Sequence, residues 1–417
     1  LSLTHSERPP VKLSHRLAAV TVAAATTLGL VACADSDDQN SSATASDVVT
    51  AQSEGSSTNS NARSTDAALT VTDAAGRTVD FDERPERIVL AEGRATFATS
   101  LLQDNPFDHV VAYGEDLEKA SPAFKKMLLE KFPEAKNMPA IGSLEKGDAT
   151  VENILAQKPD VVVMTLDQKK AAEQNGFLTN LDAAGLKYVF TDFRQKPLQN
   201  TTVSMTLLGD LLGKEDRAKE YNEFYEQKVK DIEDRAGKTT GRPNVAIWAA
   251  AGFNDCCSIV GDANLGTLIS AAGGHNLGPD VLGTDSSTIT PEKLVELNPE
   301  KLIVTGGEWA RDPQKTEAYR HVELGYQADE ATAKETFDGP LKTPGLEMLS
   351  APKTGNYYAV YHQFYDNPFN IFALEAFAKW IHPEEFADLQ PAKDFADFHA
   401  KWLPYDYSGT FFVDSNS

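Results

Sequence analysis

One sixteen-residue pattern occurs twice in this chain, 140 positions apart. The segments "TVENILAQKPDVVVMT" (Thr150 to Thr165) and "TPEKLVELNPEKLIVT" (Thr290 to Thr305) align without a gap. In each copy an apolar stripe with helical spacing leads to a proline that stops the helix, and a run typical of a buried parallel strand follows. The pattern predicts two α/β lobes of similar construction. The alternative is that two unrelated helix–strand units resemble each other by chance.

The rest of the chain alternates in the same way. Apolar runs predict strands at 87–91, 109–114, 187–192 and 244–250, separated by amphipathic helices. Between the halves, residues 200–235 keep helical spacing, with a break expected at Gly213. We therefore expect an N-terminal α/β lobe (67–198), an interlobe helix (199–237) that acts as a stiff hinge, and a C-terminal α/β lobe (238–417).

The N-terminal residues predict export. Lys12, His15 and Arg16 precede an apolar run that ends at Cys33, as in a secretory signal peptide covering 1–33. The ending "LVAC" resembles a bacterial lipobox, which implies a lipid such as palmitate on Cys33. The alternative is a plain signal peptide with a chance cysteine. Residues 34–66 are rich in Ser, Thr, Asn and Asp and contain no aromatic residue, which predicts a disordered tether.

The charge balance excludes one class of partner. The chain has 417 residues, more than one ordinary core, and carries 39 basic against 62 acidic residues for a net charge of −23. Nucleic acid and anionic lipid surfaces are bound through basic patches, so neither is an expected partner.

Several segments in their order resemble one family. They are "VTDAAGRTVDFDERPERIVLAEGR", the two repeat copies, "LISAAGGHNLG" (Leu268 to Gly278) and "VYHQFYDNPFNIFALEAFAKWIHPEEFADL". Over residues 69–413 the chain resembles the substrate-binding lipoproteins of ABC importers for ferric siderophores, haem and cobalamin, and among these the iron-complex branch. The resemblance implies a class III binding protein with two α/β lobes, a long backbone helix and a ligand cleft between the lobes.

The resemblance also implies a function and its partners. Such a protein is a monomer, held at the extracytoplasmic face of the cell membrane through the lipid on Cys33. It captures an iron(III)–siderophore-type chelate and delivers it to an ABC permease with a cytoplasmic ATPase; haem, cobalamin and a nickel chelate are the alternatives. Glu152 and Glu292 occupy equivalent repeat positions and match the glutamates that the family's permeases read. The alternative is that each only favours the start of a helix.

Three arginines follow predicted strands, where open α/β sheets bind ligands. Arg94, Arg194 and Arg311 together suit an anion such as a catecholate, carboxylate or phosphate. For Arg94 the alternative is a surface pair with Glu92. Aromatic side chains that could form flat walls of the site are Trp248, Phe253 and Trp309, although Trp248 suits core packing equally well.

The segment "VYHQFYDNPFN" places Tyr361, His362 and Tyr365 between a strand and a helix expected to start near Asn367. A phenolate and an imidazole suit Fe³⁺ or haem iron, so Tyr361 and His362 are candidate metal ligands. Adjacent residues of a strand point to opposite faces, so only one of the pair faces the cleft unless the strand has ended. Asn367 and Pro368 suit the cap and first turn of the helix.

Cys256 and Cys257 are adjacent, which in an exported protein favours a vicinal disulfide with a structural or cleft-lining role. A reduced pair binding a soft metal is the alternative. No intrinsic cofactor is expected. The chain contains neither H-E-x-x-H nor G-x-S-x-G nor a P-loop, which argues against an enzyme. A secreted metallohydrolase and a haem-capture protein that works without a permease remain as rival classes.

Overall fold

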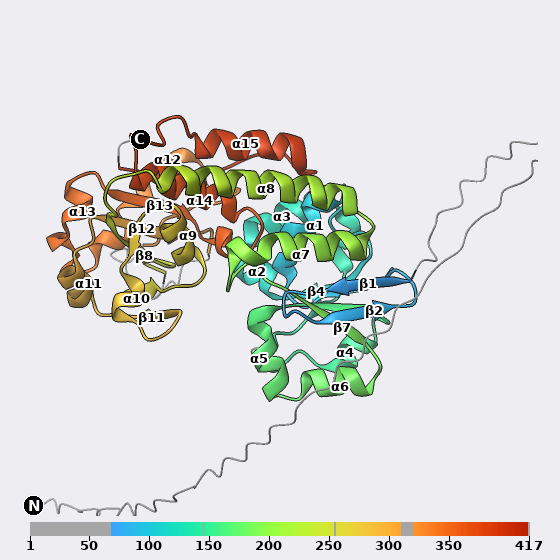
Figure 1. Cartoon of the computed structure of the whole chain (residues 1–417). Coiled ribbons are helices and arrows are strands. Elements are labelled where there is room, and N and C mark those ends of the chain that lie inside the picture. The colour runs from blue at the N-terminus through green and yellow to red at the C-terminus, as the bar shows by residue number, and fades with distance from the viewer. Residues whose placement is uncertain (1–67, 145, 254–255, 310–319, 416–417) are drawn as a thin grey trace, which may run out of the picture. The chain divides into compact units, whose positions relative to one another are not determined.

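The computed structural model describes residues 68–144, 146–253, 256–309 and 320–415, which lie in one compact unit, Arg63–Ser417 (Figure 1). The expected signal peptide with Cys33, the expected tether and Arg311 lie outside the described residues. Among the helices that are described, none combines the length and apolar character needed to cross a bilayer.

The first sheet has five parallel strands in the order β5-β4-β3-β6-β7. They are β3 (Ile88–Leu90), β4 (Val110–Gly114), β5 (Ala140–Ile141), β6 (Val161–Thr165) and β7 (Lys187–Thr191). An antiparallel hairpin, β1 (Leu69–Thr72) and β2 (Thr78–Phe81), precedes them. The accompanying helices are α1 (Thr96–Leu102), α2 (Asp116–Ala120), α3 (Pro122–Lys131), α4 (Val151–Leu155), α5 (Leu166–Gln174) and α6 (Phe177–Ala183), with 3-10 turns η1 (Gly93–Ala95) and η2 (Pro133–Asn137).

The second sheet has seven strands along the path β11-β9-β8-β12-β13-β14, with β10 paired to β8. Its centre is parallel and its edges are antiparallel. The strands are β8 (Asn244–Trp248), β9 (Ser258–Val260), β10 (His275–Asn276), β11 (Ser286–Thr288), β12 (Lys301–Gly306), β13 (Tyr357–Tyr361) and β14 (Phe412–Asp414). The helices are α9 (Leu265–Ala271), α10 (Gly278–Val281), α11 (Pro291–Leu297), α12 (Glu330–Phe337), α13 (Ser350–Lys353), α14 (Asn370–Ile381) and α15 (Pro391–Trp402), with 3-10 turns η4 (Pro340–Lys342), η5 (Leu346–Met348) and η6 (His362–Tyr365).

The two copies of the repeat occupy equivalent places in the two sheets. In the first copy α4 leads into β6, which lies between β3 and β7; in the second α11 leads into β12, which lies between β8 and β13. The predicted fold class, α/β with two sheets of similar construction, is confirmed.

Two helices connect the sheets. α7 (Pro197–Leu212) ends at Gly213, whose φ of 64° lies in the left-handed region that favours glycine, and α8 (Glu215–Ala236) follows. The segment expected as an interlobe helix is thus a pair of helices, and the break lies at Gly213, where the sequence predicts it. α8 contacts α1 beside the first sheet and both α9 and α14 beside the second (Figure 1).

The core of the C-terminal half is aromatic and centres on α14. All residues of this helix except Lys379 are buried. α14 begins at Asn370, after the 3-10 turn η6 and a bend at Asn367 and Pro368, so the helix starts three residues later than the sequence predicts. The Asn367 side chain forms this bend by donating to the Gln363 carbonyl at 2.6 Å and accepting from the Phe369 N–H at 2.8 Å.

Candidate functional site

A cavity of about 310 Å³ lies at the carboxyl ends of strands from both sheets. A second depression of about 730 Å³ shares Gln195, Ala263 and Asp285 with it and continues it along α7 and α9. The charged and hydrogen-bonding side chains that line the cavity are those of Asp167, Arg194, Gln195, Ser258, Asn264, Asp285, Ser286, Thr305, His362 and Tyr365. This is the position at which open α/β sheets bind ligands.

Arg194 lies in this wall because the turn after β7 is held in place. The buried Asp192 accepts hydrogen bonds from the backbone N–H groups of Arg194, Gln195 and Lys196 at 2.9, 2.7 and 3.0 Å. The Arg194 guanidinium pairs with Glu92 at 2.7 Å, with Asp366 at 3.3 Å and with Asp167. Asp366 follows β13 of the other sheet, so these pairs join groups from both sheets.

Arg94 follows β3 and lies beside Arg194. Its Nε donates to Asp116 at 2.9 Å, and its terminal nitrogens pair with Glu92 and Asp366 and donate to the Tyr365 hydroxyl. Asp116 also accepts from the backbone N–H of Gly93 at 2.6 Å, where a Cβ would lie 2.4 Å from the Gly114 carbonyl oxygen. Glycine therefore permits the close approach of β3 and β4 that brings Asp116 to Arg94.

The cluster formed by these ion pairs contains more acids than bases. Arg94 and Arg194 face Glu92, Asp116, Asp167 and Asp366. Burial raises the pKa of Asp366 to about 7 and, with the Glu92 charge, that of Asp116 to about 6, against the pull of the arginines. Burial raises the pKa of Asp167 as well. Burial alone would also raise the pKa of Glu92, but the charges of Arg194 and Arg94 hold this pKa below its ordinary value.

The sequence singled out the arginines of this cluster and not its acids, apart from naming Glu92 as a possible partner of Arg94. The rule that selected the arginines applies equally to Asp116, Asp167 and Asp366, each of which closely follows a strand. The signal that could have identified these acids is therefore the one that identified the arginines, a charged residue soon after a strand.

His362 faces the cavity and Tyr361 does not. The Thr305 hydroxyl lies 2.7 Å from His362 Nδ1, and the Trp309 and Tyr365 rings lie 5.0 and 4.7 Å from the imidazole. Burial, then the charges of Arg94 and Arg194, lower the pKa of His362 to about 3, so the imidazole is neutral at pH 7. Tyr361 is 2% exposed and packs against Tyr326, Phe364 and Phe411 in the core.

Tyr365 presents its ring to both arginines. The Arg194 and Arg94 guanidinium carbons lie 4.8 and 5.5 Å from the ring centroid. Of the aromatic candidates, Trp248 is 1% exposed within β8 and belongs to the core. Trp309 is half-buried and contacts Phe253 at 4.8 Å in addition to His362.

Glu152 and Glu292 occupy matching local structures. Each lies in the first turn of its helix, α4 or α11, and each is exposed. The helix caps also match, because Thr150 accepts from the Asn153 N–H and Thr290 from the Lys293 N–H, both at 3.2 Å. The repeat thus presents the two carboxylates in the same way on the two halves.

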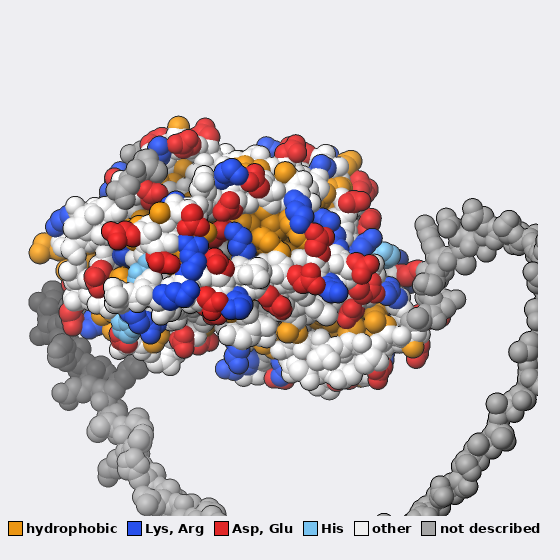
Figure 2. All heavy atoms as spheres, turned by 45° about the horizontal axis from the view of Figure 1, so that its top comes forward, with side chains coloured by type: hydrophobic (Ala, Val, Ile, Leu, Met, Phe, Trp, Pro, Cys, Tyr) orange, Lys and Arg blue, Asp and Glu red, His pale blue; other side chains and the backbone are white. Residues whose placement is uncertain are grey.

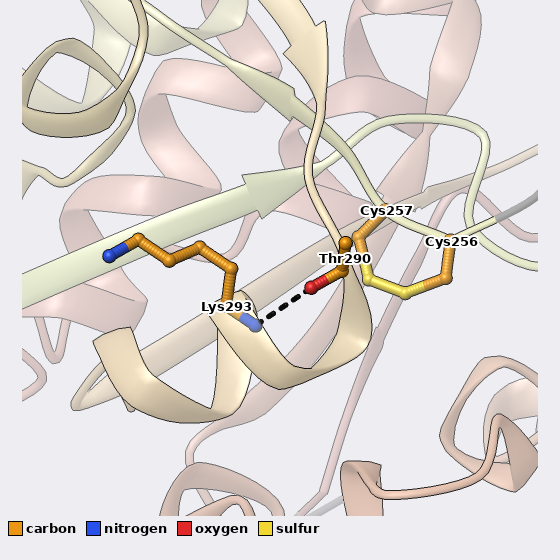
Figure 3. Close-up of a disulfide and its surroundings, with 4 residues drawn as sticks. All are labelled: Cys256, Cys257, Thr290 and Lys293. Atoms are coloured by element: carbon orange, nitrogen blue, oxygen red, sulfur yellow. Dashed lines mark hydrogen bonds between the residues drawn. A yellow bond between two sulfur atoms is a disulfide. The ribbon is translucent and has the colours of Figure 1, made fainter.

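Cys256 and Cys257 form a disulfide beside the start of α11 (Figure 3). Cys257 is fully buried, and its N–H and C=O bond the C=O and N–H of Ile289 at 2.8 and 3.0 Å. Ser258, which follows Cys257, lines the cavity, and Thr290, which follows Ile289, caps α11. The disulfide therefore lies between the cavity wall and the helix that carries Glu292.

Within the described parts of the chain, no group of three or more His, Cys, Asp and Glu side chains is placed to hold a metal ion. One neutral imidazole, His362, faces the cavity, while the phenol of Tyr361 does not.

A sequence profile of the periplasmic binding protein family matches residues 115–360, more than half of the chain. The chain belongs to this family, whose members are solute-binding components of ABC transporters rather than enzymes. The resemblance stated from the sequence is confirmed. No curated protein matches the chain.

Solved structures show the same fold. The TroA-like periplasmic binding protein FepB from Veillonella parvula is 27% identical, with 83% of this chain and 99% of that chain covered and a TM-score of 0.74. MolA from Haemophilus influenzae, bound to molybdate, is 16% identical over 82% of this chain and 99% of its own, with a TM-score of 0.60. CeuE from Helicobacter pylori, in a nickel–histidine complex, is 15% identical over 82% and 97%, with a TM-score of 0.58.

Proposed function

We propose that this chain is a lipid-anchored, extracytoplasmic binding protein that captures an iron(III) chelate of the siderophore type and delivers it to an ABC permease. The observation that carries the proposal is the cavity at the carboxyl ends of both sheets, lined by Arg194, His362 and Tyr365. MolA with molybdate and CeuE with a nickel–histidine complex hold different solutes on the same fold, so the residues of this cavity determine its ligand.

The cavity suits a chelate better than a bare ion. With its adjoining depression it offers the room of a small-molecule site. A chelator that already fills the coordination shell of iron leaves oxygen and nitrogen atoms at its surface for hydrogen bonds. Hydroxyl and amide groups of Ser258, Ser286 and Asn264 line the cavity for such contacts.

Haem is the second candidate, because of His362. Its imidazole is held neutral and could serve as an axial ligand, with the Trp309 and Tyr365 rings beside it. Cobalamin and nickel chelates have no such specific contact in their favour.

Delivery and anchoring complete the proposal. Glu152 and Glu292, presented alike on the two halves, would meet basic residues of a two-fold permease, whose ATPase lies in the cytoplasm. The lipid on Cys33 and the 34–66 tether would hold the monomer at the outer face of the membrane.

Calorimetric titration of the mature protein tests the capture step. We expect one ferric chelate to bind per chain at micromolar or tighter affinity, and the metal-free chelator to bind at least tenfold more weakly. Arg194→Met should weaken binding, because Glu92, Asp167 and Asp366 lose the cation that holds them together at the cavity wall. Arg87→Met, at an exposed arginine away from the cavity, serves as the matched control. Haem binding without binding of any ferric chelate would favour the second candidate, and multiple turnover of a substrate would contradict both.

A further inference from the structure

We propose that the cavity accepts ferric chelates that are neutral or positively charged and discriminates against anionic ones. This inference rests on the proposed function and specifies the chemical class of its ligand. It runs against the expectation from the sequence, in which arginines at strand ends suited an anion.

The arginines are already committed to protein carboxylates. All three side-chain nitrogens of Arg94 bind Glu92, Asp116, Asp366, Gln363 or Tyr365. Both terminal nitrogens of Arg194 bind Glu92, Asp167 and Asp366, which leaves only its Nε without a hydrogen-bond partner. An incoming anion would have to displace a carboxylate from a guanidinium to gain the same contact.

The charges near the cavity sum to a negative value. Two guanidinium groups face four carboxylates in the cluster, and a fifth, that of Asp285, lines the cavity wall. His362 is neutral and adds no positive charge. Lys119 and Lys146 line a separate depression beside Arg94 and both pair with Glu115, so these three groups add one positive charge and the total stays negative. Residues 310–319 carry two basic and two acidic side chains, so by sequence they do not change the balance.

Two of the carboxylates also lack hydrogen bonds to one of their oxygens. Asp167 Oδ1 and Asp366 Oδ1 are both buried without a partner, and Asp167 lines the cavity. These oxygens carry negative charge beside the cavity that no hydrogen bond offsets, and this charge disfavours a ligand that presents further oxyanions.

Matched ligands can isolate charge from shape. A linear trihydroxamate with a free terminal amine forms a ferric complex with one positive charge; acetylating the amine makes the complex neutral, and succinylating it gives one negative charge. The iron coordination is the same in all three. We expect the affinity at pH 7.5 to fall from the cationic to the neutral to the anionic complex, with the anionic complex binding roughly tenfold to a hundredfold more weakly than the cationic one. The gap should narrow as salt is added.

Variants separate a local from a global charge effect. Asp285→Asn should reduce the discrimination several-fold, while Asp182→Asn, at an exposed site on α6 away from the cavity, should leave it unchanged. Equal effects of the two variants, or an anionic complex that binds as well as the cationic one, would overturn the inference. If a ferric tricatecholate with three negative charges binds and no hydroxamate does, the inference fails and the proposed function stands. If no ferric chelate of any charge binds, both fail.

Discussion

Asp366 binds the guanidinium groups of both Arg94 and Arg194. The two arginines follow strands of the first sheet, whereas Asp366 follows a strand of the second. Burial favours the protonated form of Asp366, whereas the two arginines favour its carboxylate. Burial has the larger effect and raises the pKa of Asp366 to about 7. The charge of the cluster therefore changes within the physiological range. The charged and titratable groups that act on Asp366 are Arg94, Arg194, Glu92, Asp116, Tyr361 and Tyr365.

This titration predicts that charge discrimination depends on pH. Below pH 7 Asp366 binds a proton, and the cluster becomes less negative. We expect the preference for the cationic trihydroxamate complex over the anionic one to be several-fold smaller at pH 6 than at pH 8. Titrations at the two pH values with the wild type and Asp366→Asn measure this. A preference that grows on acidification, or that changes equally in the variant, would contradict the assignment to Asp366.

Trp309 should report on ligand binding. Its ring lies 5.0 Å from that of His362 at the cavity, while Trp248 is buried in β8. A bound ferric chelate should quench the intrinsic fluorescence, and Trp309→Phe should remove most of the quench. Trp248→Phe is the control and should retain it. A quench that survives in the Trp309 variant would place the ligand elsewhere.

At the scale of elements, the repeat builds two exposed carboxylates on matching helices. α4 and α11 share a threonine cap and a glutamate in the first turn, and each leads into the strand at the same place in its sheet. A glutamate in the first turn also favours the start of a helix. Docking to a two-fold partner is the proposal that would in addition explain why both carboxylates are exposed at matching positions.

Removing these carboxylates should affect delivery and not capture. In the Glu152→Gln/Glu292→Gln variant we expect unchanged chelate affinity but at least about tenfold slower chelate uptake by cells, because contacts to charged partners are lost. Glu226→Gln, at an exposed position on α8, is the matched control. Unchanged uptake in the double variant would reject the docking role and favour a capture protein that works without a permease.

Across the whole molecule, α8 contacts helices beside both sheets, and Lys228 on this helix pairs with the fully buried Glu375 of α14. On the face shown in Figure 2, acidic and basic side chains are interspersed and neither sign forms one large patch. The net charge of −23 thus leaves this face mixed, without the basic patch that a nucleic-acid partner requires.

Glu375 should make stability fall as pH rises. Burial raises its pKa from 4.5 to about 7 despite the pull of Lys228. Between these values the folded chain holds a proton that the unfolded chain has lost, so the free energy of unfolding decreases with rising pH, by at most about 3 kcal/mol. Glu375→Gln should lose this dependence. Urea unfolding at pH 5 and pH 7.5 tests it, and equal pH profiles for variant and wild type would contradict it.

Local patterns predicted more of the fold than of the site. Each helix–strand unit, with the proline that ends its helix, is specified within sixteen consecutive residues of the repeat. The prediction that only one of Tyr361 and His362 faces the cleft assumed that the strand continues. β13 ends at Tyr361, so the turn η6, which the sequence does not show, orients His362 instead. The pairing of Arg94 and Arg194 with four acids depends on non-consecutive strands lying side by side, which no local spacing specifies.

Native mass spectrometry of the mature protein, with metal analysis and a panel of ferric chelates and haem, measures chelate capture itself. We expect a monomer that retains one ferric chelate per chain, with the neutral and cationic complexes retained in preference to anionic ones. A protein that retains no ferric chelate while binding haem or a bare metal ion would contradict the proposed capture of a ferric chelate.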